Sequence, residues 1–106
     1  MQATYLRFYV HENHKHGGKL LYEWLFDQAR GLGVPGGSAF RAIAGYGRHG
    51  VVHEQRFFEL SADLPVEIEF VVTDAQAESL LALMRKEKIK AVYARVPAEV
   101  GTTGDE

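Results

Sequence analysis

The residues best suited to binding chemistry lie in one segment, residues 38–65. An apolar stretch there is followed by Gly45-Tyr46-Gly47-Arg48-His49-Gly50. Glycine at alternate positions leaves strand backbone bare, which often marks a bulge or a place where a ligand or another backbone comes close. The bare amides, with the Arg48 guanidinium and the His49 ring, offer donors for phosphate oxygens. We interpret the segment as ligand-facing; a twisted hairpin without a ligand fits these residues equally well.

Known phosphate-binding loops, nucleophilic catalysis and metal binding receive less support from the sequence. The glycine run does not open a helix, so it is neither a Walker phosphate loop nor a dinucleotide fingerprint. The chain has no cysteine, and none of its serines lies in a Gly-x-Ser-x-Gly motif, so we expect no nucleophilic catalysis. His11, His14 and His16 form a histidine-rich tract, but strand and loop positions make it hard for them to converge. We therefore predict no catalytic residue and no metal.

A pair of carboxylates, Glu67 and Glu69, lies two positions apart on an expected strand and so shares one face of it. Paired acids of this kind can serve general acid–base catalysis. Arg7 and Arg95 are expected on the same face, which makes a cross-strand ion pair the better interpretation.

Hydrophobic periodicity indicates the elements that must position these groups. Alternation of apolar residues predicts strands, and spacings of three and four predict helices. Thr73-Asp74-Ala75-Gln76 fits a capping box, and Gly33 with Pro35 beyond it marks the end of the first helix. The expected strands are residues 3–12, 38–46, 66–72 and 89–96, and the expected helices are residues 19–32 and 74–88.

The order β-α-β-β-α-β in one domain predicts an α+β fold of the ferredoxin-like type, a four-stranded antiparallel sheet with two helices on one face. We assign residues 1–97 to this domain and residues 98–106, which lack periodicity, to a flexible C-terminal tail. The other face of the sheet is left uncovered. We expect it to carry Tyr5, Arg7, Tyr9, His11, Glu67, Glu69, Tyr93 and Arg95, and to be solvated, to stack bases or to meet copies of itself.

Composition narrows the class of protein. The chain has 106 residues, 12 Lys plus Arg against 14 Asp plus Glu, and a formal net charge of −2. No electrostatic footprint for duplex nucleic acid or an anionic membrane is present. Apolar runs stay short of about 18 residues and no signal-peptide pattern opens the sequence, so a cytoplasmic location is expected.

Three stretches together resemble the PII signalling superfamily, specifically its PII-like branch long carried as a domain of unknown function. The resemblance spans residues 5–96. Its residues are Lys15-His16-Gly17-Gly18-Lys19-Leu20-Leu21-Tyr22-Glu23, the Gly45-Tyr46-Gly47 motif after a strand with Arg41 and Ile43, and Phe57-Phe58-Glu59-Leu60-Ser61-Ala62-Asp63-Leu64-Pro65.

The resemblance implies a non-enzymatic signalling protein, a homotrimer with an adenine nucleotide (AMP, ADP or ATP) in clefts between its subunits. It implies Gly45, Gly47 and Arg48 as cleft residues and Ser38 as the small hydroxyl residue early in the strand; we add Tyr46 and His49, which complete the motif. Some relatives are associated with membrane transporters or channels, so such a protein is a possible regulatory target.

The sequence also departs from the PII pattern. The segment after the glycine pair is shorter than the corresponding PII loop, and the glycine-containing turn before the last strand is replaced by Arg85-Lys86-Glu87-Lys88-Ile89-Lys90. Two other functions stay open. One is a small ferredoxin-like enzyme or metal-binding protein that uses histidines of a subunit cleft. The other is RNA binding, which Glu67 and Glu69 oppose because they repel phosphate.

Overall fold

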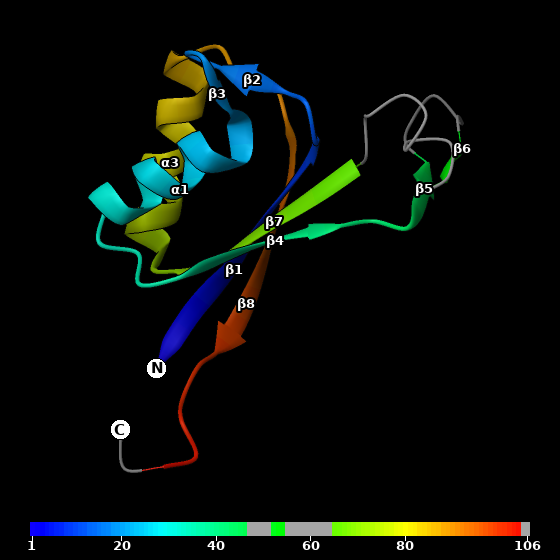
Figure 1. Ribbon diagram of the computed structural model, residues 1–106. Coiled ribbons are helices and arrows are strands. Elements are labelled where there is room, and N and C mark those ends of the chain that lie inside the picture. The colour runs from blue at the N-terminus through cyan, green and yellow to red at the C-terminus, as the bar shows by residue number, and fades with distance from the viewer. Residues whose placement is uncertain (47–51, 55–64, 105–106) are drawn as a thin grey trace.

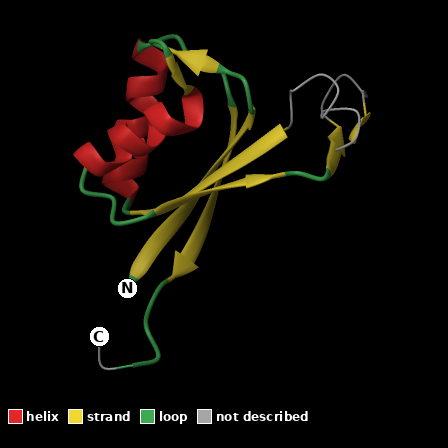
Figure 2. Ribbon diagram, viewed as in Figure 1, coloured by secondary structure: helices red, strands yellow, loops and turns green. Residues whose placement is uncertain are grey.

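The computed structural model of the chain describes residues 1–46, 52–54 and 65–104. Within these ranges it has helices on one side of an antiparallel sheet (Figures 1 and 2). The elements are β1 (Gln2–His11), β2 (Lys15–His16), β3 (Lys19–Leu20), α1 (Leu21–Gly31), β4 (Gly37–Arg41), β5 (Ala44–Tyr46), β6 (Val52–Glu54), β7 (Pro65–Val72), α3 (Asp74–Lys86) and β8 (Val92–Glu99).

The main sheet among the described residues has four strands in the order β4-β7-β1-β8, with antiparallel neighbours. This order, with α1 between β1 and β4 and α3 between β7 and β8, is the ferredoxin-like arrangement, so the predicted fold class is confirmed. The strand expected at residues 38–46 is interrupted after Arg41. Its second half, β5, pairs with β6 as a separate hairpin.

The core lies between the sheet and the helices. Alternate residues of β1 and β7, which include the fully buried Leu6, Phe8 and Ile68, face inward, as their period of two predicts. The helices add residues at spacings of three and four, among them Leu25 and Leu80. Burying one such side chain stabilises the fold by about 1.5–3 kcal/mol.

The helix ends follow their sequence signals closely. Thr73 accepts from the Gln76 amide at 3.1 Å, and the Gln76 side chain accepts from the Thr73 amide at 2.9 Å, so the capping box is formed. After α1, Gly33 has a φ of +82°, and the Val34 amide donates to the Ala29 carbonyl at 3.0 Å. This pattern is a Schellman motif, which satisfies carbonyls that the helix leaves free.

The first helix begins later than predicted, at Leu21 instead of Lys19. The reason is a short hairpin, β2–β3, in which Gly17 and Gly18 have φ values of +60° and +82°. Positive φ at both central residues of a two-residue loop is the type I′ geometry that glycine pairs favour. The expected loop before the helix is therefore ordered as a hairpin.

The last strand differs from expectation in its position and its orientation. It runs from Val92 to Glu99, so Ala98 and Glu99, assigned to the tail, pair with β1. Arg95 lies opposite Leu6, a core residue. The prediction that Tyr93 and Arg95 face the uncovered side was therefore wrong, because directly opposite residues of antiparallel strands share a face.

Both side chains find partners on the helix side. The Tyr93 ring is tilted against that of Phe8, with centroids 6.4 Å apart. Arg95 Nη1 donates to Glu78 Oε1 at 2.5 Å, and Nη2 lies 3.6 Å from Asp74 Oδ1, both on α3. The hydrogen bond to Glu78 raises the pKa of Arg95 further, so this cation stays charged beside the helix.

Candidate functional site

The predicted binding residues that the structure describes lie on two different strands, β4 and β5. Ser38 is in β4, opposite Glu69 of β7, and faces the side of the sheet away from the helices. Gly45 and Tyr46 are in β5, after the break at residues 42–43, on a hairpin that stands away from the main sheet (Figure 1). The structure therefore does not bring Ser38 together with Gly45 and Tyr46 within one chain.

Gly47, Arg48 and His49, the remaining predicted site residues, lie outside the described residues. Gly45 is as bare as predicted, since a Cβ built on it meets nothing within 4 Å. The neighbouring side chains of Ile43 and Tyr46 are 76% and 77% exposed. Large apolar side chains held this far out in solvent are a usual mark of a contact surface.

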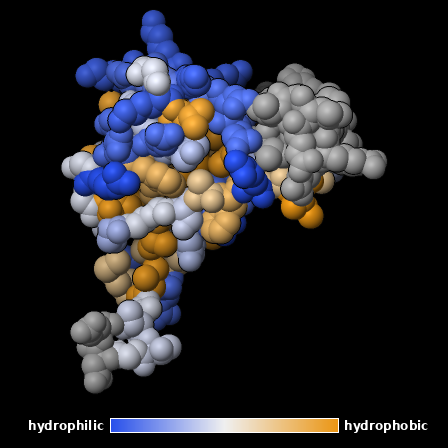
Figure 3. All heavy atoms as spheres, viewed as in Figure 1, coloured by the Kyte–Doolittle hydropathy of each residue, from blue (hydrophilic) through white to orange (hydrophobic). Residues whose placement is uncertain are grey.

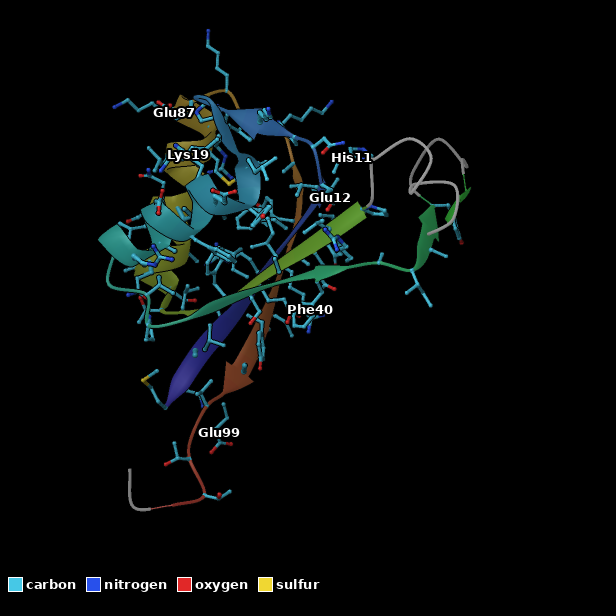
Figure 4. All side chains as sticks on the ribbon, in the orientation of Figure 1. His11, Glu12, Lys19, Phe40, Glu87 and Glu99 are labelled. Carbon is cyan, nitrogen blue, oxygen red and sulfur yellow. The ribbon has the colours of Figure 1, made fainter. Side chains whose placement is uncertain are left out.

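An open groove of about 460 Å³ lies where β4, β1 and β7 end beside α1. It is lined by Glu12, Tyr22, Ala39, Phe40, Arg41 and Val66. Two of these residues are paired: Arg41 Nε donates to Glu12 Oε1 at 2.9 Å, and Arg41 Nη2 donates to the same oxygen. Figure 4 labels Glu12 and Phe40 of this groove. Sequence reasoning missed this pair, because only the strand register brings the end of β1 next to the end of β4.

The sheet surface away from the helices, which we call the open face, is uncovered in the single chain. Register places on it side chains of all four described strands of the main sheet, which include Ser38, Phe40, Pro65, Glu67, Glu69, Val71, Ala3, Tyr5, Arg7, Tyr9, His11, Val92, Ala94, Val96 and Ala98. Phe40, Val92 and Val96 are 51%, 60% and 41% exposed. The open face thus leaves apolar side chains in water, a pattern typical of interfaces. In the view of Figure 3, hydrophilic residues gather at the upper end of the molecule and hydrophobic ones lie below them.

An ion-pair cluster occupies the middle of the open face. Arg7 Nε lies 2.9 Å from Glu69 Oε1 and 3.6 Å from Glu67 Oε1, as the expected cross-strand pairing predicts. The contact at 2.9 Å is electrostatic, because the buried Nε is not aligned for a hydrogen bond with any described residue. The Arg7 guanidinium also stacks over Tyr5, 5.5 Å from the ring centroid.

The histidine-rich tract serves a structural contact. His16 Nε2 lies 3.0 Å from Glu87 Oε1 at the end of α3, and its ring meets the Trp24 ring edge-on at 4.9 Å. These contacts hold the β2–β3 hairpin against both helices. Among the described residues there is no group of three metal-ligating side chains.

Another ion pair joins β3 to α1, away from the open face. Lys19 Nζ donates to Asp27 Oδ2 at 2.5 Å, and this contact lowers the pKa of Asp27 and raises that of Lys19. Both groups are in solvent, so the pair adds little to stability. No helix in the described part of the chain has the length and apolar character needed to cross a membrane.

Residues 3–100 match the family DUF190, described as "Uncharacterized ACR, COG1993". The chain belongs to the DUF190 family. Two curated UPF0166 proteins are similar to this DUF190 chain. The protein from Aquifex aeolicus is 29% identical over 96 residues, 83% of this chain and 91% of the relative. The protein from Methanocaldococcus jannaschii is 37% identical over 71 residues, 67% of this chain and 65% of the relative.

Solved structures with the same fold are PII-like. One is CPII, a nitrogen regulatory PII-like protein from Thiomonas intermedia K12, in a structure bound to ADP, AMP and bicarbonate. It superposes on this chain with a TM-score of 0.71 at 22% sequence identity, over 96% of this chain and 91% of that one. A second CPII structure, bound to ADP and bicarbonate, gives a TM-score of 0.68 at 23% identity, over 96% and 91%. These likenesses show that this DUF190 chain has the fold of PII-like proteins, as the predicted resemblance implies.

Proposed function

We propose that this DUF190 protein is a non-enzymatic regulator that binds an adenine nucleotide, AMP, ADP or ATP, in clefts between the subunits of a homotrimer. The observation that carries the proposal is the match in fold to PII-like structures that hold ADP, one of them together with AMP. The proposal is also supported by the Gly45-Tyr46-Gly47 motif, which follows β4 in the sequence and begins in β5.

The open face supports assembly with identical copies. Its β4 edge carries an aromatic side chain, Phe40, whereas its β8 edge carries the smaller Val92, Ala94 and Val96. Edges of different shape suit a head-to-tail contact that closes into a ring, in which a bulky edge of one subunit meets the low edge of the next. Covering these exposed side chains removes apolar surface from water, which favours association.

A cleft between subunits also explains why the candidate site is incomplete in one chain. Gly45 and Tyr46 stand on a hairpin with free space beside them, and Ser38 points to the open face. A neighbouring subunit on the open face supplies the missing wall. Bare amides near Gly45, with Arg48 and His49, would then hold phosphate oxygens.

Binding signals only if the nucleotide contacts one conformation better than another. We propose that residues 48–63 are the segment a partner reads, and that the protein acts in the cytoplasm on a target such as a membrane transporter or channel. The formal net charge of −2 does not favour nucleic acid as a partner.

Isothermal titration calorimetry with AMP, ADP and ATP, each with and without bicarbonate, tests binding. Gly45→Val is the sharpest variant, because a Cβ at this position meets nothing within 4 Å, so we expect the fold to stay intact. We expect it to abolish nucleotide binding, since it fills the cleft. Arg48→Ala should weaken binding by tenfold or more by removing a charge-assisted contact.

The matched control is Gly101→Val, which also meets no atom within 4 Å but lies in the C-terminal segment. It should bind nucleotide as the unaltered protein does. Molecular mass in solution, measured with and without nucleotide, tests the trimer separately. A protein that releases no heat with any of the three nucleotides, or that is monomeric at high concentration, refutes the proposed function.

A further inference from the structure

One row of side chains crosses the open face from edge to edge. Glu67 of β7 lies directly between Phe40 of β4 and Tyr9 of β1, and Val92 of β8 follows Tyr9. Phe40 and Tyr9 are 51% and 47% exposed, and the Glu67 side chain between them is 33% exposed. A surface that covers these aromatic rings must therefore cover the Glu67 carboxylate as well.

Among the described residues of this face, the permanent charges do not balance. Arg7 is the cation that meets both carboxylates, and its Nε is closer to Glu69, at 2.9 Å, than to Glu67, at 3.6 Å. One arginine against two glutamates leaves about one negative charge per subunit, and the longer distance assigns it to Glu67. Burying a carboxylate without a partner is costly, and such groups usually take up a proton instead.

Apart from Arg7, none of the described groups around Glu67 carries a permanent positive charge. On β1 the ionisable neighbours are Tyr5, Tyr9 and His11, besides Arg7, and on β7 the neighbour is Glu69. The side chains that β4 and β8 place on the open face are apolar or a hydroxyl. A second copy that approaches with either of these edges therefore brings no cation to Glu67 from the described part of its open face.

Resting on the homotrimer of the proposed function, we infer that closing the open face between copies of this chain takes up a proton at Glu67. The assembled protein then binds more protons than the separated subunits. Association is therefore strengthened as pH falls and weakened as pH rises, by linkage. Uptake of one proton per subunit changes the association constant of three subunits by up to about a thousandfold per pH unit.

The experiment measures oligomer mass by sedimentation velocity and mass photometry across a dilution series, at pH 5.5, 6.5, 7.5 and 8.5, in constant salt. The unaltered protein should dissociate at higher concentrations as pH rises. Glu67→Gln, which keeps the shape and removes the charge, should stay assembled at pH 8.5 and lose most of the pH dependence. Glu23→Gln removes the same charge from the exposed side of α1 and should behave like the unaltered protein.

The outcomes separate this inference from the function on which it rests. A monomer at every pH, for the protein and for Glu67→Gln, removes the trimer and with it both proposals. A trimer whose dissociation does not change with pH keeps the trimer and overturns the proton uptake. A trimer that is weakened by Glu67→Gln also overturns it, since Glu67 would then be paired with a cation of the neighbouring subunit.

Discussion

Gly37, the first residue of β4, has a packing role that a single substitution can test. A Cβ at this position would lie 2.5 and 2.7 Å from two carbons of the Phe70 ring and 3.3 Å from Phe26. The Phe70 ring is buried, and the Phe26 ring meets it edge-on with centroids 5.9 Å apart. The ring therefore has no free direction in which to move.

The magnitude follows from that geometry. To reach the ordinary contact distance of 3.4 Å, the Phe70 ring in Gly37→Ala must move by about 0.9 Å into Phe26 or the core. Overpacking of this kind costs about 1–3 kcal/mol. Alanine returns about 0.5–1 kcal/mol, because it restricts the unfolded chain more than glycine does. We expect a net loss of about 1–2 kcal/mol in the free energy of unfolding.

Urea unfolding at matched protein concentration measures this loss, with Gly36→Ala as the control. A Cβ on Gly36 meets nothing within 4 Å, so that variant should be as stable as the original or more so. Replacing Phe70 by leucine in the Gly37→Ala background should relieve part of the clash, which a double-mutant cycle detects. Equal stability of Gly37→Ala and Gly36→Ala would refute the packing argument.

Three further predictions concern the helices. Lys88, which follows α3, has a φ of +59° and so takes a left-handed conformation that glycine adopts more easily. Lys88→Gly should therefore raise the free energy of unfolding in urea by up to about 1 kcal/mol. Lys86→Gly, within the helix, should lower it by about as much. Thr73→Ala should cost about 1 kcal/mol by removing the N-cap, and Thr73→Ser should restore most of it; equal thermal stability of the two variants would contradict this. Because Asp27 has a lowered pKa, its small contribution to the stability of the fold is present above its unfolded-state pKa and is lost as pH falls through its folded-state pKa. Lys19→Met should raise the Asp27 pKa in an NMR titration. An unchanged pKa would show that the Lys19 contact is absent in solution.

Sequence reasoning succeeded where a local pattern fixes a local structure. The capping box at Thr73 and Gln76, the stop at Gly33 and the inward residues of β1 depend on a few neighbouring residues each, so they were predictable. The order of elements then sufficed for the ferredoxin-like topology. The β2–β3 hairpin was missed although Gly17-Gly18 is a known signal for it, because the helix pattern that follows was extended too far back.

Sequence reasoning failed where the orientation or the partner of a side chain depends on residues far away in the sequence. Alternation in β8 separates Tyr93 and Arg95 from Val92, Ala94 and Val96, but it does not say which set faces the helices. The carboxylate of Glu78 on α3 makes the inward position acceptable for an arginine, and that contact spans 17 residues. The pairing of Arg41 with Glu12 likewise depends on strand register.

The candidate site was predictable only in part. Its glycine-rich motif is visible in the sequence, and Gly45 is as open as expected. The sequence could not show that Ser38 and Tyr46 lie on different strands, β4 and β5. The interruption after Arg41 contains no proline or glycine that would indicate it.

A polar contact holds the layer of α1 and α3 at each end, one between the helices themselves and one through His16 of β2, whose ring packs on Trp24 of α1. Gln76 Nε2 donates to the Leu32 carbonyl at 3.2 Å where α1 ends and α3 begins, and His16 reaches Glu87 where α3 ends. Sliding one helix along the other would break a polar contact at each end, so shear is an expensive motion for this layer. We therefore expect any rearrangement linked to the proposed nucleotide binding on the strand side of the molecule, and amide exchange should show the helices opening as one unit.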